Sequence, residues 1–303
     1  MREGGSAPLG GGTDLLVMIG EGLVRPHTLV DLRRIPGFSS IDWTGEGGVR
    51  LGAGVRIAEL ARDPRIAERF RALHSACESV GTPALRNMGT LGGNLCQRPR
   101  CWYFRRGIPC LKNGGDSCPA ATGENQYHAV LGGGPCFIVH PSDPAVALTA
   151  LDARVEIAGP AGRRTVAMEE FFVPPSRRLD HETVLAAGEI VAAVHVPAYS
   201  AGQVQRYDKV MQRGAWDFAL VSLAVARRVD GGVRMALGGV APTPWRVASS
   251  VEEDVASGNL DMDDIETLAE RALYDARPLA KNGYKVAIAA ALLRRGMAAL
   301  ARP

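Results

Sequence analysis

The stretch Gly89-Thr-Leu-Gly-Gly-Asn94 leads directly into the most cysteine-rich part of the chain. Glycines in such a loop let backbone N–H groups approach a phosphate closely, and a threonine hydroxyl adds a further donor. The candidate phosphate-binding residues are Gly89, Thr90, Gly92, Gly93 and Asn94. Four cysteines follow, at Cys101, Cys110, Cys118 and Cys136. A phosphate-binding loop beside a candidate set of metal ligands predicts a protein that moves electrons.

A second loop of the same chemistry lies near the start of the chain, at Gly10, Gly11, Gly12, Thr13 and Asp14. Taken alone, such a pattern is more often a plain turn. Two such loops in one chain could hold the two phosphates of a dinucleotide from separate sides. Neither loop matches G-x-G-x-x-G or the P-loop pattern, so the sequence does not indicate a Rossmann site or an ATPase.

The four clustered cysteines have the spacing C-x8-C-x7-C-x17-C, without the close pairs that are typical of zinc sites. Four widely spaced thiolates can enclose an iron–sulfur cluster, which takes four cysteine ligands. From spacing alone, an iron–sulfur cluster, a zinc site and free or disulfide-bonded cysteines all remain open. Cys96 could substitute as a ligand, whereas Cys77 is expected on the apolar face of a helix, in the core.

The bulk composition is that of a globular protein, with 303 residues, 46% hydrophobic and 22% charged, and a net charge of +3. No apolar run approaches the length of a membrane span. The arginines are scattered rather than grouped in a stripe with aromatic residues, which argues against nucleic-acid binding. No targeting segment is evident, so we expect a cytoplasmic chain, or a periplasmic one exported together with a signal-bearing partner.

Residue patterns predict an α+β chain with a boundary near residue 200. The segment 97–140 shows no sustained periodicity, and so long an irregular stretch is expected only where it is functional or held by a metal. The expected strands are Leu15–Ile19, Thr28–Leu32, Val49–Ala53, Arg154–Ile157, Ile190–Val196 and Val233–Leu237. The expected helices are Ile66–Val80, Pro144–Leu151, 262–274 and 283–300.

Several motifs occur in an order that resembles one known family. They are Gly10-Gly-Gly-Thr-Asp-Leu-Leu16, Gly81-Thr-Pro-Ala-Leu-Arg-Asn-Met-Gly-Thr-Leu-Gly-Gly-Asn94, His140-Pro-Ser-Asp-Pro-Ala-Val-Ala-Leu148, Gly188-Glu-Ile190, Tyr207-Asp-Lys209 and Ala236-Leu-Gly-Gly-Val240. In this combination the chain resembles the FAD-binding (medium) subunits of the molybdenum hydroxylases, the family of xanthine dehydrogenase, carbon monoxide dehydrogenase and aldehyde oxidoreductase.

Residues 97–140, here called the cysteine segment, indicate which members of the family the chain resembles most. With this segment the chain resembles the flavin subunits of periplasmic aldehyde oxidoreductase and 4-hydroxybenzoyl-CoA reductase. In those subunits an inserted loop carries a [4Fe–4S] cluster. The context Arg100-Cys-Trp-Tyr-Phe-Arg105 is closer to the aldehyde oxidoreductase type. The resemblance therefore implies that Cys101, Cys110, Cys118 and Cys136 are the cluster ligands.

The fold that the resemblance implies is the FAD-binding fold of the vanillyl-alcohol oxidase (PCMH) type, with an inserted Fe–S loop. That domain would cover 1–198, with the insertion at 97–140, and a C-terminal α/β domain of the CO dehydrogenase flavoprotein type would cover 203–303. The two glycine loops would bind the FAD pyrophosphate and ribityl chain. Asp143 would hydrogen-bond the cofactor, and Ile190 and Lys209 would lie near the isoalloxazine ring.

The function implied is an electron-transfer subunit, which passes electrons from Fe–S clusters to FAD and on to an acceptor. Its partners would be a large subunit with the molybdenum cofactor and a small [2Fe–2S] subunit. Because the substrate would be oxidised at the molybdenum centre of the large subunit, no catalytic acid or base is needed on this chain. The alternatives are a flavin subunit of the 4-hydroxybenzoyl-CoA reductase type, a self-sufficient flavin oxidase, and a zinc-stapled binding module. One departure is that family members usually have a strand and a helix before the first glycine loop, whereas only about a turn of chain is expected before Gly10.

Overall fold

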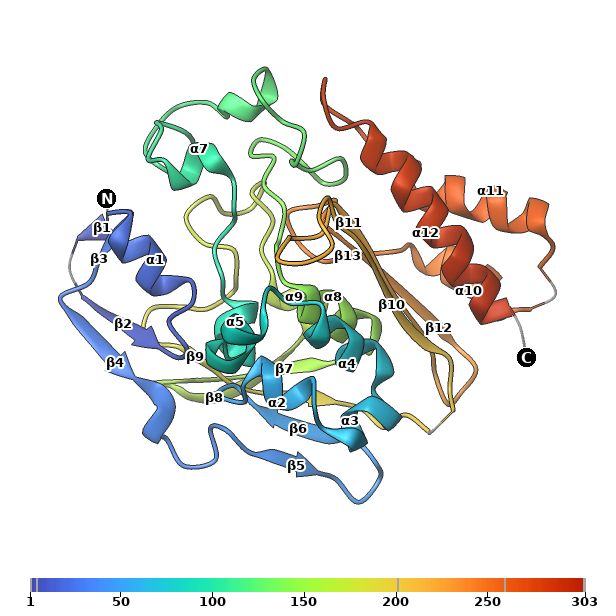
Figure 1. Cartoon of the computed structure of the whole chain (residues 1–303), viewed down its shortest axis with the longest axis horizontal. Helices are drawn as coiled ribbons and strands as arrows, with labels where there is room; N and C mark the ends of the chain where they lie inside the picture. Colours follow the sequence, from blue (N-terminus) through green and yellow to red (C-terminus); the bar gives the residue numbers. More distant parts are fainter. Residues whose placement is uncertain (1, 4, 201, 259, 302–303) are drawn as a thin grey trace.

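The computed structural model describes residues 2–3, 5–200, 202–258 and 260–301. Its architecture is mixed α and β, as the sequence predicts. A five-stranded sheet and a four-stranded sheet are joined by helices that lie between them (Figure 1). Among the described residues, no helix has the length and apolar character needed to cross a bilayer.

The chain begins with two short parallel strand pairs. β1 (Arg2–Glu3) pairs with β3 (Val24–Arg25), and β2 (Ser6–Leu9) pairs with β4 (Thr28–Asp31). More than a turn of chain therefore precedes Gly10. The predicted strand at Leu15–Ile19 is wrong, because these residues form helix α1 (Leu15–Gly20). Parallel strands need a crossover connection, and α1 lies in the crossover from β2 to β4.

The five-stranded sheet is antiparallel, with the order β5-β6-β9-β7-β8. It confirms the strands predicted at Val49, Arg154 and Ile190. Inward-facing Val, Leu and Ile side chains of the central strands are buried in one hydrophobic cluster. The strands are β5 (Ile41–Trp43), β6 (Val49–Gly52), β7 (Arg154–Gly159), β8 (Gly162–Ala167) and β9 (Ile190–Val196), with helix η1 (Leu32–Arg34) before them and α9 (Met168–Phe171) after β8.

Helices cover the inner side of this sheet. The helix predicted over Ile66–Val80 is divided at Phe70, whose backbone (φ −129°, ψ 55°) ends one helix and begins the next. The Phe70 ring is fully buried and stacks on Trp43, with ring centroids 5.9 Å apart, so side-chain packing overrides the helical periodicity. The helices are α2 (Ile57–Leu60), α3 (Pro64–Arg69), α4 (Arg71–Glu78), α5 (Pro83–Met88), α6 (Leu91–Leu95) and α8 (Asp143–Ala150).

Helix α8 is buried along its whole length and packs against both halves of the molecule. The Ser142 hydroxyl caps it by accepting from the Ala145 N–H at 3.1 Å, and Pro144 lies in the first turn, as predicted. A helix without a polar face must have protein on all sides. The neighbours of α8 include α4, α6 and the strands β11 and β12.

The second sheet is also antiparallel, with the order β10-β11-β12-β13, and three helices cover its outer face (Figure 1). Helix α12 approaches β11 closely, since a Cβ at Gly296 would lie 2.8 Å from Leu223. The predicted strand at Val233 and both predicted C-terminal helices are confirmed. The elements are β10 (Gln205–Val210), β11 (Val221–Arg227), β12 (Val233–Gly238), β13 (Trp245–Arg246), α10 (Ser249–Ala256), α11 (Met262–Ala272) and α12 (Tyr284–Ala301).

The cysteine segment contains only α7 (Trp102–Arg105) and the short helix η2 (Pro119–Ala121), in agreement with its lack of periodicity. In Figure 1 it forms the green loop region above α8, and it returns toward helix α12.

An ionic network joins the two sheets. Asp152, in the turn between α8 and β7, accepts from Arg228 (2.9 Å), Arg234 (2.9 Å) and Arg246 (3.1 Å), which all belong to the second sheet or its edge. Arg246 also pairs with the buried Glu252 at 3.0 Å. One carboxylate therefore bridges three guanidinium groups where the two halves meet.

We predict that Asp152→Asn lowers the free energy of unfolding by about 1–3 kcal/mol, because it leaves three partly buried arginines without their shared anion. Asparagine tolerates the positive φ of 50° at this position, so the change isolates the charge. Urea denaturation measures the effect. Asp230→Asn is the matched control, since Asp230 also pairs with Arg228 but is 60% exposed, and it should change stability by less than about 0.5 kcal/mol. Equal losses in the two variants would contradict the assignment.

Candidate functional site

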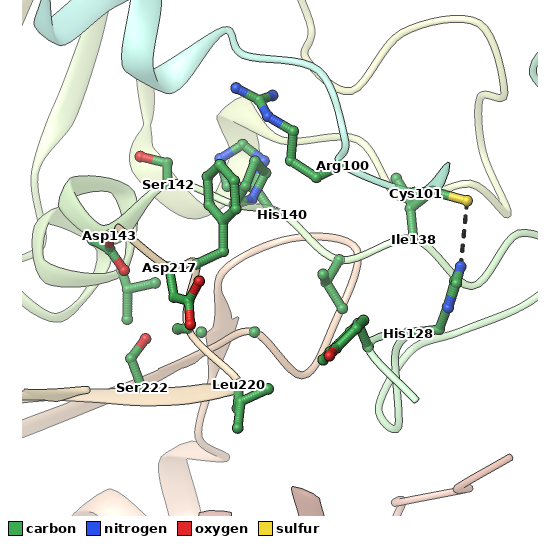
Figure 2. Close-up of a pocket in the computed structure, with 18 of the residues that line it drawn as sticks. Arg100, Cys101, His128, Ile138, His140, Ser142, Asp143, Asp217, Leu220 and Ser222 are labelled. Atoms are coloured by element: carbon green, nitrogen blue, oxygen red, sulfur yellow. Dashed lines mark hydrogen bonds between the residues drawn. The ribbon is translucent and has the colours of Figure 1, made fainter. Parts of the chain in front are cut away.

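Two neighbouring cavities lie where α8, the glycine loops and the second sheet meet. The smaller, of about 110 Å³, is lined by residues of both glycine loops. The larger, of about 350 Å³, lies between the cysteine segment and the second sheet (Figure 2). Both cavities are lined by Arg100, Pro141, Asp143, Asp217 and Phe218. The volumes are therefore two parts of one hollow region.

The two glycine loops pack directly against each other. A Cβ at Gly11 would lie 1.8 Å from the Met88 carbonyl oxygen, so only glycine permits this contact. A Cβ at Gly92 would lie 2.8 Å from the Ala53 side chain. Gly11 and Gly92 therefore hold the loops in place and do not line the smaller cavity.

Other residues of these loops do face that cavity: Thr13, Asp14, Gly89, Gly93 and Asn94. Thr90 instead caps α6, with its hydroxyl accepting from the Gly93 N–H at 3.2 Å. In the described structure, Gly10, Gly12 and Ile190 line neither cavity. Five of the ten predicted phosphate-binding residues therefore line the smaller cavity. Of the two predicted neighbours of the flavin ring, Lys209 lines neither cavity, and Ile190 lies apart at the start of β9.

Asp14 ties the first glycine loop to the cysteine segment. Its carboxylate accepts from the Arg98 N–H (2.8 Å) and from the Arg105 guanidinium (2.7 Å), and it pairs with Arg100 at 3.0 Å. This carboxylate is therefore occupied by arginines of the segment, which shapes the loop around the cavity.

Asp143 is the central charged group of the region. Tyr207 donates to it at 2.6 Å and Lys209 at 2.8 Å, and Lys209 also donates to the Ser79 carbonyl at 3.0 Å. Burial raises the pKa of Asp143, and Lys209 and Tyr207 oppose that rise. Asp143 and Lys209 were predicted. Tyr207 was not assigned a role, although the two-residue period of a strand places it on the same face as Lys209.

Two further residues of the site were not predicted. The Arg100 guanidinium lies 5.1 Å from the centre of the Phe218 ring, and this cation–π contact stands between the two cavities. Burial lowers the pKa of Arg100 to about 10, while Asp14 acts in the opposite direction. Phe218 lies in an irregular loop between β10 and β11, where no short sequence pattern indicates a role.

All six cysteines are free. Cys101 lines the larger cavity, and its sulfur lies 3.3 Å from Nε2 of His128 (Figure 2). Cys101 lies within electrostatic reach of Cys110 and Cys118, and Cys118 is hydrogen-bonded to Cys136, which lowers the pKa of Cys118. Within the described residues, however, no three His, Cys, Asp or Glu side chains are close enough to hold a single metal ion.

The remaining two cysteines differ from these four. Cys77 is fully buried in α4, as predicted, and burial raises its pKa. Burial raises the pKa of Cys96 to about 12. Both side chains therefore remain neutral thiols at ordinary pH.

Helix α12 and the turn before it hold the far half of the cysteine segment. Asn282, fully buried, donates to the carbonyls of His128 and Ala129, each at 3.1 Å. Lys285, also buried, donates to the Tyr127 carbonyl at 2.8 Å and to the Gly239 carbonyl at 2.7 Å. Hydrogen bonds from Asn282 and Lys285 therefore hold the second half of this segment in place.

Comparison with known proteins agrees with this architecture. Residues 2–199 match the FAD binding domain in molybdopterin dehydrogenase, and residues 206–300 match the CO dehydrogenase flavoprotein C-terminal domain. The chain is 36% identical over 292 residues to the aldehyde oxidoreductase FAD-binding subunit PaoB of Escherichia coli, covering 95% of this chain and 89% of that one.

The chain is a FAD-binding subunit of the molybdenum hydroxylase family. It is 27% identical to the putative xanthine dehydrogenase FAD-binding subunit XdhB of E. coli, covering 89% of this chain and 78% of that one. The solved structure of carbon monoxide dehydrogenase from Hydrogenophaga pseudoflava superposes with a TM-score of 0.74 at 26% identity, covering 97% of this chain and 89% of that one. The predicted family, fold class and oxidoreductase function are confirmed, and FAD is the cofactor that the family binds.

We predict that Gly93→Ala in this flavin subunit weakens FAD binding at least about tenfold with little change in melting temperature. In the described structure, an added Cβ would meet only the Thr90 hydroxyl, at 3.0 Å, on a backbone that faces the cavity. Fluorescence titration of the apoprotein with FAD measures the effect. Gly283→Ala, with no described atom within 4 Å of its Cβ, is the control and should bind FAD normally. Unchanged FAD affinity in the Gly93 variant would remove this loop from the site.

We also predict that Lys285 gives the subunit a pH-dependent stability. Burial lowers the pKa of Lys285 from 10.5 to about 7, so between these values the unfolded chain binds a proton that the folded chain does not. Stability of the wild type relative to Lys285→Met should therefore rise as pH increases from 7 to 10. Urea denaturation across this range measures the difference.

The control is Lys281→Met, because the neighbouring Lys281 is 49% exposed and pairs with Glu124. Its stability difference from the wild type should stay flat from pH 7 to 9. A flat difference for Lys285→Met as well would mean that Lys285 titrates as an exposed lysine.

Proposed function

We propose that this subunit holds FAD along the two cavities and relays electrons in an aldehyde-oxidising molybdenum hydroxylase. The observation that carries the proposal is the direct packing of the two glycine loops, which line one cavity together with the buried Asp143. The aldehyde assignment rests on the similarity to PaoB. When bound, FAD supplies the electron-accepting and electron-donating chemistry.

The residues of the smaller cavity fit the phosphate part of such a cofactor. Thr13 and Asn94 lie at the cavity wall, where a side-chain hydroxyl and a side-chain amide could donate to an anion. The backbone N–H groups of Gly89, Gly93 and Asn94 already donate within the protein, to the Leu85 carbonyl, the Thr90 hydroxyl and the Thr90 carbonyl. Arg100 adds a positive charge on the same wall. Gly10, Gly11, Gly12, Thr90 and Gly92 pack behind these lining residues and hold the two loops in place. We keep Lys209 as a proposed residue of the flavin site because it donates to Asp143, whereas Ile190, which lies apart from both cavities, is not placed beside the isoalloxazine ring.

We further propose a [4Fe–4S] cluster held by Cys101, Cys110, Cys118 and Cys136. In its support, the four thiols come from one segment, and Cys101 and Cys136 each interact with Cys118. A cluster of four irons keeps its ligands farther apart than a single ion does, so its ligands need not form a close triad. Cys101 also lines the larger cavity, which would place the cluster beside the flavin region.

The division into domains and the assembly also belong to this proposal. We propose domains at 1–198 and 203–303, with the insertion at 97–140. In support, the hydrophobic cluster around α8 belongs mostly to the first range and the one beneath α12 mostly to the second, although each takes a few residues from the other range. A large molybdenum-cofactor subunit and a small [2Fe–2S] subunit would be the partners. The similarity to PaoB, which is itself a FAD-binding subunit of an aldehyde oxidoreductase, supports an assembly with other chains. Export with a signal-bearing partner would make the complex periplasmic; otherwise it is cytoplasmic.

The relay function predicts that the subunit alone binds FAD but does not reduce it with an aldehyde. Anaerobic absorbance spectroscopy at the flavin band measures this, with benzaldehyde as the probe. Dithionite should bleach the flavin of the same sample, which shows that the flavin is competent. Co-purified complex should bleach with benzaldehyde. Bleaching of the isolated subunit by benzaldehyde would identify a self-sufficient oxidase instead.

The cluster assignment predicts that Ser replacement at any of the four proposed ligands lowers bound iron to a small fraction of the wild-type value, because serine is a poor ligand for iron in such clusters. Iron analysis and low-temperature electron paramagnetic resonance measure it. Cys77→Ser is the matched control and should retain full iron. Iron loss in Cys96→Ser with retention in Cys101→Ser would mean that Cys96 is the ligand.

A further inference from the structure

His140 is a buried polar side chain without a hydrogen-bond partner on its ring. It is 4% exposed, and neither imidazole nitrogen has a partner among the described residues. Its backbone is fixed by donation to the Ala241 carbonyl at 3.0 Å, and its ring packs on Phe172 with centroids 4.4 Å apart. Buried polar groups are almost always hydrogen-bonded, so an orphaned imidazole requires an explanation.

The ring of His140 lines the larger cavity. Figure 2 shows it in the middle of the cavity wall, near Arg100 and Asp217, with Ser222 on the opposite side. The volume of about 350 Å³ is in the usual range for small-molecule sites. A partner for the two ring nitrogens can therefore enter from this cavity.

The rest of the lining indicates a flat and largely apolar ligand. Trp102, Tyr127 and Phe218 offer ring surfaces, and Ile138 and Leu220 offer aliphatic ones. Gly238 and Gly239 lie at the second-sheet side, where a Cβ at Gly238 would meet Ser222 and Val146. The glycine loops that suit a phosphate line only the smaller cavity.

We propose that the larger cavity binds a planar ring that bears carbonyl oxygens, and that His140 is the hydrogen-bonding residue that orients this ring. A neutral imidazole presents one N–H donor and one acceptor that point in different directions, so it can donate to a carbonyl oxygen or accept from an imide N–H. Two sources have this chemistry: the isoalloxazine ring of FAD itself, and a separate quinone-like electron acceptor next to the flavin. The inference rests on the proposed placement of FAD in the adjoining cavity.

The charge state of His140 is consistent with an uncharged ligand. Burial lowers the pKa of His140 to about 3, and Arg100 lowers it further. The imidazole is therefore neutral at ordinary pH and does not attract an anion.

The test compares His140→Leu with the wild-type full-length chain by titration calorimetry, with FAD, ADP and 1,4-naphthoquinone as ligands. ADP carries the pyrophosphate but no ring. If the flavin ring occupies the cavity, the variant should bind FAD about tenfold more weakly and ADP unchanged. If a separate acceptor occupies it, FAD and ADP binding should be unchanged. The FAD-loaded variant should then bind 1,4-naphthoquinone about tenfold more weakly.

His140→Gln keeps one donor and one acceptor, so it should restore most of the lost affinity, whereas a merely structural role would not be rescued in this way. If the leucine variant does not fold, ¹⁵N-histidine NMR of the wild type replaces the calorimetric comparison. The resonance of His140 is assigned by its absence from the spectrum of the glutamine variant. That resonance should shift on addition of FAD but not of ADP if the flavin ring occupies the cavity. If a separate acceptor occupies it, the resonance should shift when 1,4-naphthoquinone is added to the FAD-loaded chain.

Unchanged affinities for all three ligands, an unmoved resonance, or equal losses for FAD and ADP would overturn the proposal. Failure of the wild type to bind FAD would instead overturn the proposed function.

Discussion

The structure depends above all on the burial of one carboxylate, Asp143, at the start of helix α8. Taking an ionised carboxylate out of water is costly unless it is paired, and here Lys209 and Tyr207 of β10 provide the pairing. Because α8 packs in the first half of the molecule and β10 belongs to the second sheet, this contact fixes how the halves meet. Asp143 lines both cavities, so the shape of this hollow region depends on the same contact.

The cysteine segment contacts both halves of the molecule at this junction. At one end its arginines bind Asp14 of the first glycine loop, and at the other end Asn282 and Lys285 hold its carbonyl groups. Between these ends it supplies Arg100 and Cys101 to the wall of the larger cavity. A segment placed in this way joins the two glycine loops to the C-terminal helices and to the larger cavity.

Much of this arrangement could be predicted from sequence, because some demands are local. Close approach of the backbone to a ligand needs glycine, and the family motifs identify Asp143 and Lys209. Long-range packing left no local pattern: the contact of Gly11 with Met88 and the division of a helix at Phe70 both depend on residues distant in sequence. A five-residue apolar run such as Leu15–Ile19 is compatible with a strand or a helix. It forms a helix here because it lies in the connection between the parallel strands β2 and β4. His140 escaped assignment because its lack of a partner is visible only in three dimensions.

The most direct test of this account is a crystal structure of the chain with FAD bound. The account predicts that the pyrophosphate lies in the smaller cavity against Gly89 and Gly93. It should be within hydrogen-bond distance of the Thr13 hydroxyl and the Asn94 side-chain amide, with Asp143 facing the cofactor. FAD bound at another surface, with the two glycine loops and Asp143 making no contact to it, would contradict the central claim that these loops form the cofactor site.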